Sequence, residues 1–302
     1  MADNHGHAPG GRPGARYRHR LTWVLVMVMA FMVAEIVGGI LTGSLALLSD
    51  AGHMATDGLG LAMSLAAIVA ATHGTSSSQR TFGLYRLEIL AALANATLLF
   101  GVAGYVVYEA VVRLSNPPEI RSGPMLAVAV GGLVVNLLSW WLLREGAAES
   151  INVEGAYLEV LADLLGSLGV IVAAVVVWTT GWLYADPIIG AAIGVFILPR
   201  AWRLGRSAVR ILVQAAPEDL DLARLRGSLA SIDGVKDVHD LHVWTLTSEM
   251  NVASVHLMTP EQVDPHPVLD EARRVLEVDF GIAHATLQVE PDSHQGCAEL
   301  AW

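Results

Sequence analysis

Six long apolar segments constrain the fold of this chain more than any other feature of its sequence. They cover residues 21–42, 45–72, 86–112, 124–144, 153–180 and 183–204. A helix needs roughly 20 predominantly apolar residues to cross the hydrocarbon core of a bilayer, so each segment is long enough to span it. The breaks between the segments are short. The sequence therefore predicts an all-α membrane domain of six transmembrane helices over residues 21–214.

Composition supports a membrane protein and limits the chemistry of any metal site. Of the 302 residues, 54% are hydrophobic and only 16% are charged, which is unusual for a soluble protein of this length. Cys297 is the single cysteine, so neither a disulfide framework nor a Cys-rich zinc site can form within one chain. A metal site would have to use His and carboxylate ligands.

Arginine placement predicts the orientation of the helices, because basic residues near the ends of spans are retained on the cytoplasmic side. With the N-terminus inside, eleven arginines of the first 216 residues are cytoplasmic and only Arg113 and Arg121 lie outside. Six spans then return the chain to the cytosol, so both termini are predicted to be cytoplasmic. Residues 1–20 read as a disordered cytosolic leader and not as a signal peptide.

The segment from residue 217 to 302 has the patterning of a small soluble domain. It alternates in the order helix, strand, strand, helix, strand over about 219–232, 235–246, 251–259, 267–278 and 283–289. This order predicts a small α+β, ferredoxin-like cytosolic domain. The domain holds 16 acidic and 5 basic residues, which argues against a nucleic-acid partner. An acidic surface is commonly just solvated, although it would also concentrate divalent cations.

Titratable side chains interrupt two of the apolar segments at helical spacing. The second segment contains Asp50, His53 and Asp57 on one helical face, and the fifth contains Glu159 and Asp163, four residues apart. Charged groups inside a span cost several kcal/mol unless they face a cavity, a partner or an ion. His53, Asp57, Glu159 and Asp163 together offer one imidazole and three carboxylates, enough ligands for one tetrahedral divalent ion.

Three other interpretations of these residues are open. They could form an ion-paired network that only fixes helix packing, but no Lys or Arg is expected inside the spans to neutralise the carboxylates. An intramembrane metallohydrolase is disfavoured because four ligands leave no open position and no general base stands apart from them. A metal sensor that transports nothing would need only ligands in the tail.

Several motifs, in order along nearly the whole chain, resemble the cation diffusion facilitator family, in particular its bacterial zinc, cobalt and cadmium efflux branch. The resemblance lies in Gly43–Asp57, Tyr85–Ala92, Gly155–Tyr157, Asp163–Ser167, Val238–Trp244 and His284–Glu290. It implies a homodimer in the inner (plasma) membrane that exports divalent metal, above all Zn²⁺, in exchange for protons. The transport site would be His53, Asp57, Glu159 and Asp163.

One departure from the family pattern concerns metal choice. Zinc-transporting members commonly have His where this chain has Glu159, so manganese, iron or cobalt is the alternative main substrate. Because metal ligation requires neutral imidazole and ionised carboxylate, metal and protons compete for the same groups, and His53 is the first candidate for proton coupling.

The resemblance also implies further metal ions bound in the cytosolic domain. His239, His256 and Glu290 lie at the matching strand positions of this chain. Nearby candidates are His242, His266, His284, His294 and Cys297. The alternative is that these are ordinary strand or surface histidines, since they show no tight ligand spacing.

Overall fold

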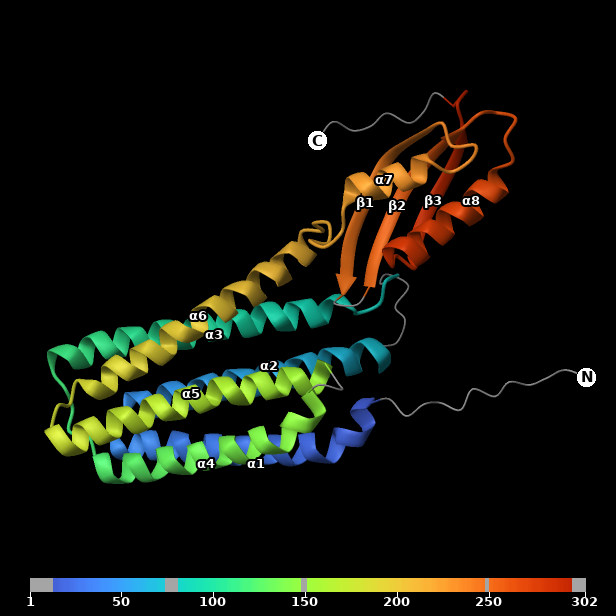
Figure 1. The fold of residues 1–302 in the computed structure, drawn as a ribbon. Coiled ribbons are helices and arrows are strands. Elements are labelled where there is room, and N and C mark those ends of the chain that lie inside the picture. Colours follow the sequence, from blue (N-terminus) through green and yellow to red (C-terminus); the bar gives the residue numbers. More distant parts are fainter. Residues whose placement is uncertain (1–12, 74–80, 148–150, 248–249, 295–302) are drawn as a thin grey trace, which may run out of the picture. The chain divides into compact units, whose positions relative to one another are not determined.

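A computed structural model describes residues 13–73, 81–147, 151–247 and 250–294. Its elements are α1 (Pro13–Thr42), α2 (Leu45–His73), α3 (Arg86–Ser115), α4 (Ser122–Ala147), α5 (Ile151–Thr180), α6 (Ala185–Leu212), α7 (Leu222–Ala230), β1 (Asp237–Thr247), β2 (Met250–Thr259), α8 (Pro265–Arg274), η1 (Val275–Asp279) and β3 (His284–Pro291) (Figure 1). They form two compact units, one of Met1–Ala62 with Asn95–Trp202 and one of Met63–Ala94 with Arg203–Trp302.

The six predicted helical segments are all helices in the structure. Among the described residues, five helices are long and apolar enough to cross a membrane: parts of α1, α4 and α5, and the whole of α3 and α6. The helix α2 is not one of these five, so the sixth span remains a prediction. The predicted disordered leader over residues 1–20 is wrong for its last part, because α1 begins at Pro13, where proline is well suited to the first helical turn.

The first unit is a helical bundle in which α4 packs against both α1 and α5. Its interior is built mainly from small and aliphatic side chains of α2, α4 and α5, such as Ala46, Ala129 and Ala173. On the outside, Trp23, Tyr105, Trp178 and many other large apolar side chains are exposed. So much exposed apolar surface is expected of helices that face lipid.

The side chain of Asp50 on α2 approaches Gly166 of α5 closely. A Cβ atom added at Gly166 would lie 2.4 Å from Oδ1 of Asp50, so no larger residue fits there without movement. Asp50 is itself 1% exposed. Gly166 therefore leaves room for the Asp50 carboxylate between the two helices that carry the predicted metal ligands.

A buried carboxylate closes the N-terminus of α2. Asp186, in the first turn of α6, is fully buried and accepts hydrogen bonds from Oγ of Ser44 at 2.5 Å and from the backbone N–H groups of Leu45 and Ala46 at 2.7 and 3.2 Å. These N–H groups have no partner within the helix, and the helix dipole favours a negative charge at this end. The chain passes from α1 to α2 through Gly43 at φ +76, where Arg113 donates to the Gly43 carbonyl oxygen at 2.5 Å.

The second unit contains a three-stranded sheet in the order β1-β2-β3, with β1 antiparallel and β3 parallel to β2. The parallel pair is connected through α8, and the predicted order of helices and strands is confirmed. Leu225 and Leu229 of α7 share one core cluster with Val268 of α8 and with Val255 and Leu257 of β2. Both helices therefore cover the same face of the sheet (Figure 1).

The β1–β2 ladder is irregular between His239 and His242. His239 is opposite His256, whereas His242 is opposite Ser254, so β1 uses one more residue than β2 across this stretch. Asp240 lies inside it at φ 51, in the left-handed region. This β-bulge bends β1 just beyond His239.

Candidate metal sites

The first group of ligand-type side chains lies where α2 meets α5. His53 and Asp57 are one turn apart on α2, and Nδ1 of His53 lies 3.4 Å from Oδ2 of Asp57. Glu159 of α5 joins them, and the three residues each offer one ligand atom within 4.8 Å of the others. Helical spacing thus brings an imidazole and two carboxylates together inside the bundle, as ligation of a divalent ion requires.

Two buried polar atoms of this group lack a hydrogen bond within the described chain. Nδ1 of His53 and Oδ1 of Asp57 make no hydrogen bond to any described residue. Buried acceptors without a hydrogen bond are costly and call for an explanation such as an ion. A bound divalent cation would satisfy both atoms, so the residues present fit a metal site.

The expectation that no basic residue reaches these carboxylates is wrong. Arg200 of α6 donates from Nη1 to Oδ2 of Asp57 at 3.2 Å and, through the same nitrogen, to Oε1 of Glu159. The sequence places Arg200 near the end of an apolar segment, where arginine reads as a marker of topology. Its long side chain carries the guanidinium from α6 to the carboxylates of α2 and α5. An ion-paired network is therefore present at these carboxylates.

Asp163, the fourth predicted ligand, does not belong to the close group of three. It is 4% exposed and lies one turn beyond Glu159 on α5, in the part of the bundle that also buries Glu35 and Asp50. A cavity of about 220 Å³ lies next to this region and is lined by residues of α2, α5 and α6, including Asp50 and His53. The structure thus places Asp163 close to the ligand group without bringing its carboxylate into it.

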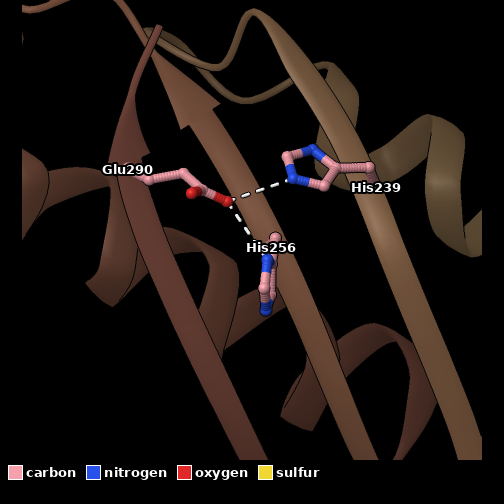
Figure 2. Close-up of side chains that lie close together, drawn as sticks. All are labelled: His239, His256 and Glu290. Atoms are coloured by element: carbon pink, nitrogen blue, oxygen red, sulfur yellow. Dashed lines mark ion pairs between the residues drawn. The ribbon is translucent and has the colours of Figure 1, made fainter. Parts of the chain in front are cut away.

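The second group lies on the sheet and consists of His239, His256 and Glu290 (Figure 2). Oε1 of Glu290 is 3.1 Å from Nε2 of His239 and 3.1 Å from Nδ1 of His256. The two imidazole rings meet edge to face at a centroid distance of 5.4 Å. Glu290 is 4% exposed and His239 7% exposed, so this is a largely buried cluster of ligand atoms.

Strand pairing explains why these three residues converge. His239 and His256 are direct partners on β1 and β2, and Glu290 of β3 is aligned with Met258, two residues beyond His256. Side chains two residues apart in a strand point to the same face, so all three share one face. Val255 and Leu257 alternate with His256 and lie in the core under α7 and α8. The cluster is therefore on the face of the sheet opposite the helices.

The other cytosolic candidates are only partly associated with this cluster. Nε2 of His294 lies 3.8 Å from Oε2 of Glu290, and His242 contacts Oδ1 of Asp240 at 2.9 Å. Asp240 also lies 3.8 Å from His256 and links His242 to the cluster. His284 instead packs edge to face with Phe82, His266 lies exposed at the start of α8, and Cys297 lies outside the described residues.

These observations define a class of protein: a helical membrane protein with one group of side chains that could hold a metal ion within its bundle and another on a small sheet domain. Two family models match the chain. The model described as the cation efflux transmembrane domain matches residues 21–213, and that of the cation efflux protein cytoplasmic domain matches residues 217–292. The chain belongs to the cation efflux, or cation diffusion facilitator, family, as its motifs predict.

Relatives match the chain over most of its length. The metal cation efflux system protein CzcD of Cupriavidus metallidurans is 46% identical over 96% of this chain and 90% of its own. The zinc transporter ZitB of Escherichia coli is 40% identical over 97% of this chain and 96% of its own. A cadmium, cobalt and zinc/H(+)-K(+) antiporter of Bacillus subtilis is 37% identical over 89% of this chain and 88% of its own.

Proposed function

We propose that this protein exports divalent transition-metal ions, principally zinc, from the cytosol across the inner membrane. The observation that carries the proposal is the convergence of His53, Asp57 and Glu159 within the bundle, where two buried ligand atoms lack a hydrogen-bond partner among the described residues. The names of the relatives, which specify cation efflux, zinc transport and cadmium, cobalt and zinc antiport, support it.

The transport site in this proposal is formed by His53, Asp57, Glu159 and Asp163. Asp163 joins the other three when α5 moves slightly relative to α2, because it lies one helical turn from Glu159. Metal is exchanged for protons at the same groups, chiefly at His53, since its imidazole binds metal only when neutral. Rigid-body motion of helices around this site then exposes it alternately to the two sides.

The proposed architecture has six spans, with α2 as the sixth, and both termini in the cytosol. Residues 21–214 form the membrane domain, and residues 217–302 form a ferredoxin-like cytosolic domain that pairs two copies into a homodimer. The family models, which match residues 21–213 and 217–292, support the proposed boundary between the two domains. His239, His256 and Glu290 hold a further metal ion in this domain, because two imidazoles and a carboxylate meet there.

A second candidate is the same transporter with manganese, iron or cobalt as its main substrate. The observation that favours it is Glu159, whose carboxylate lies in the close ligand group and makes that site harder than one with two imidazoles. Zinc still accepts carboxylate ligands and stands high in the affinity order, so zinc remains the principal proposal.

Uptake into inverted membrane vesicles tests the proposal. Vesicles with the wild-type protein should accumulate zinc when a pH gradient is imposed, and vesicles with Asp57→Ala should not, because an anionic ligand is lost. The Asp219→Ala variant, which removes a carboxylate in the cytosolic segment before α7, is the matched control and should transport normally. Zinc flux that Asp57→Ala leaves intact would refute the site, and flux indifferent to the pH gradient would refute proton coupling.

A further inference from the structure

Arg200 occupies the ligand oxygens that the metal would need. Its Nη1 donates to one carboxylate oxygen of Asp57, at 3.2 Å, and to one of Glu159. Oδ2 of Asp57 is also the atom that faces Nδ1 of His53. One guanidinium nitrogen therefore sits against two of the three residues whose ligand atoms converge.

A guanidinium group cannot share these oxygens with a metal ion on equal terms. Arginine has five N–H donors, no acceptor atom and a charge that it keeps at all physiological pH values, so it cannot become a ligand. Two positive charges a few ångströms apart repel strongly when little water lies between them. Entry of a divalent ion must therefore move Arg200 away from at least one of the carboxylates.

Arg200 lies on the more exposed side of the site. Side-chain exposure rises from 9% at His53 and 17% at Asp57 to 34% at Glu159 and 42% at Arg200. The guanidinium is therefore the least enclosed of the four groups. The residue before Arg200, Pro199, lies inside α6 and has no N–H to donate to the preceding turn, which loosens the helix there.

We propose that Arg200 is a tethered counter-cation of the transport site, a residue that promotes metal release in addition to the ligands. It neutralises Asp57 and Glu159 while the site is empty, withdraws when a divalent ion binds, and returns as the ion leaves. It thereby weakens metal binding and favours release. This inference rests on the proposed function, because it assumes that Asp57 and Glu159 bind the transported metal.

The competing explanation is that Arg200 only ties α6 to α2 and α5. The two explanations predict opposite effects of removing its charge. A structural tie, once cut, would loosen the ligands and weaken metal binding. A tethered counter-cation, once removed, would leave the carboxylates free for the metal and so strengthen binding.

The test is the dissociation constant for zinc of the full-length protein in detergent, measured at pH 8 by competition with a chromophoric chelator. All variants carry His239→Ala and His256→Ala, so that the signal reports the membrane site. Arg200→Gln and Arg200→Met should each bind zinc more tightly, by on the order of tenfold, because a charge that opposes the metal is gone. Arg200→Lys, which keeps the charge, should stay close to the parent protein.

Arg203→Gln is the matched control, since Arg203 is an exposed arginine one turn further along α6, and its affinity should not change. The inference would be overturned if both neutral Arg200 variants bound zinc no more tightly than the parent protein while still eluting as a single species. An Asp57→Asn variant in the same background separates a failure of the role proposed for Arg200 from a failure of the proposed transport site. If Asp57→Asn loses zinc binding while the Arg200 variants show no gain in zinc affinity, only the role proposed for Arg200 is refuted. If Asp57→Asn binds zinc like the parent protein, the proposed transport site is refuted as well.

Discussion

Gly166 offers a sharp test of the geometry around the proposed transport site. In Gly166→Ala the added methyl group would lie 2.4 Å from Oδ1 of Asp50, which is about 0.6 Å shorter than 3.0 Å, a distance below which Cβ contacts are essentially never found. Asp50 is buried and cannot simply swing into solvent. Either its carboxylate rotates or α5 moves away from α2, and overpacking of this kind costs about 1–3 kcal/mol.

The expected result of Gly166→Ala is a lower thermal unfolding midpoint in detergent together with reduced zinc uptake, because α2 carries His53 and Asp57 and α5 carries Glu159 and Asp163. Gly104→Ala is the matched control. Gly104 is also inside a helix, α3, but an added Cβ would meet no atom within 4 Å. Alanine there should stabilise the helix by about 0.5–1 kcal/mol. If both variants behave alike in stability and uptake, the inferred contact between Gly166 and Asp50 is refuted.

Two further predictions concern carboxylates of the helical bundle. Asp186→Ala removes three hydrogen bonds at the start of α2 and should lower the free energy of unfolding by about 3 kcal/mol or more, with a smaller loss in Asp186→Asn. The measurement is denaturation in detergent, and equal midpoints for wild type and Asp186→Ala would contradict this. Glu159→His makes the ligand group softer and should shift competitive uptake toward zinc and cadmium relative to cobalt and manganese; an unchanged ratio would show that Glu159 does not touch the metal.

Helix positions and strand order could be predicted from the sequence because both depend on local patterns. The apolar segments ended within a few residues of the observed helices at most positions, where Gly43 or a Gly/Pro break interrupts them. Spacing of three and four residues also predicted that Asp57 and Glu159 face a common interior. It could not predict depth along the helix, so Asp163, which shares a face with Glu159, was expected in the close group and lies outside it.

Long-range contacts of polar side chains could not be predicted from local sequence patterns. Arg200 and Asp186 each pair with residues more than 100 positions away in the chain, and neither their residue type nor their spacing signals a partner. A signal existed only in the charge balance: three carboxylates within apolar segments need compensation, and Arg200 is the arginine that lies furthest inside any of the six segments. The β-bulge at Asp240 could not be predicted either, because an alternating strand pattern indicates which side chains share a face but not where the strand pairing is irregular.

The order in which the sheet cluster is assembled follows from its strand topology. His239 and His256 lie on the two strands of one hairpin, a local contact that can form as soon as both strands have been synthesised. Glu290 arrives on β3, the last strand described, and reaches them only after α8 has crossed over to form a parallel pair. During synthesis the two imidazoles therefore exist for a time without their carboxylate, and the nascent domain cannot present the complete three-residue cluster until β3 has been made.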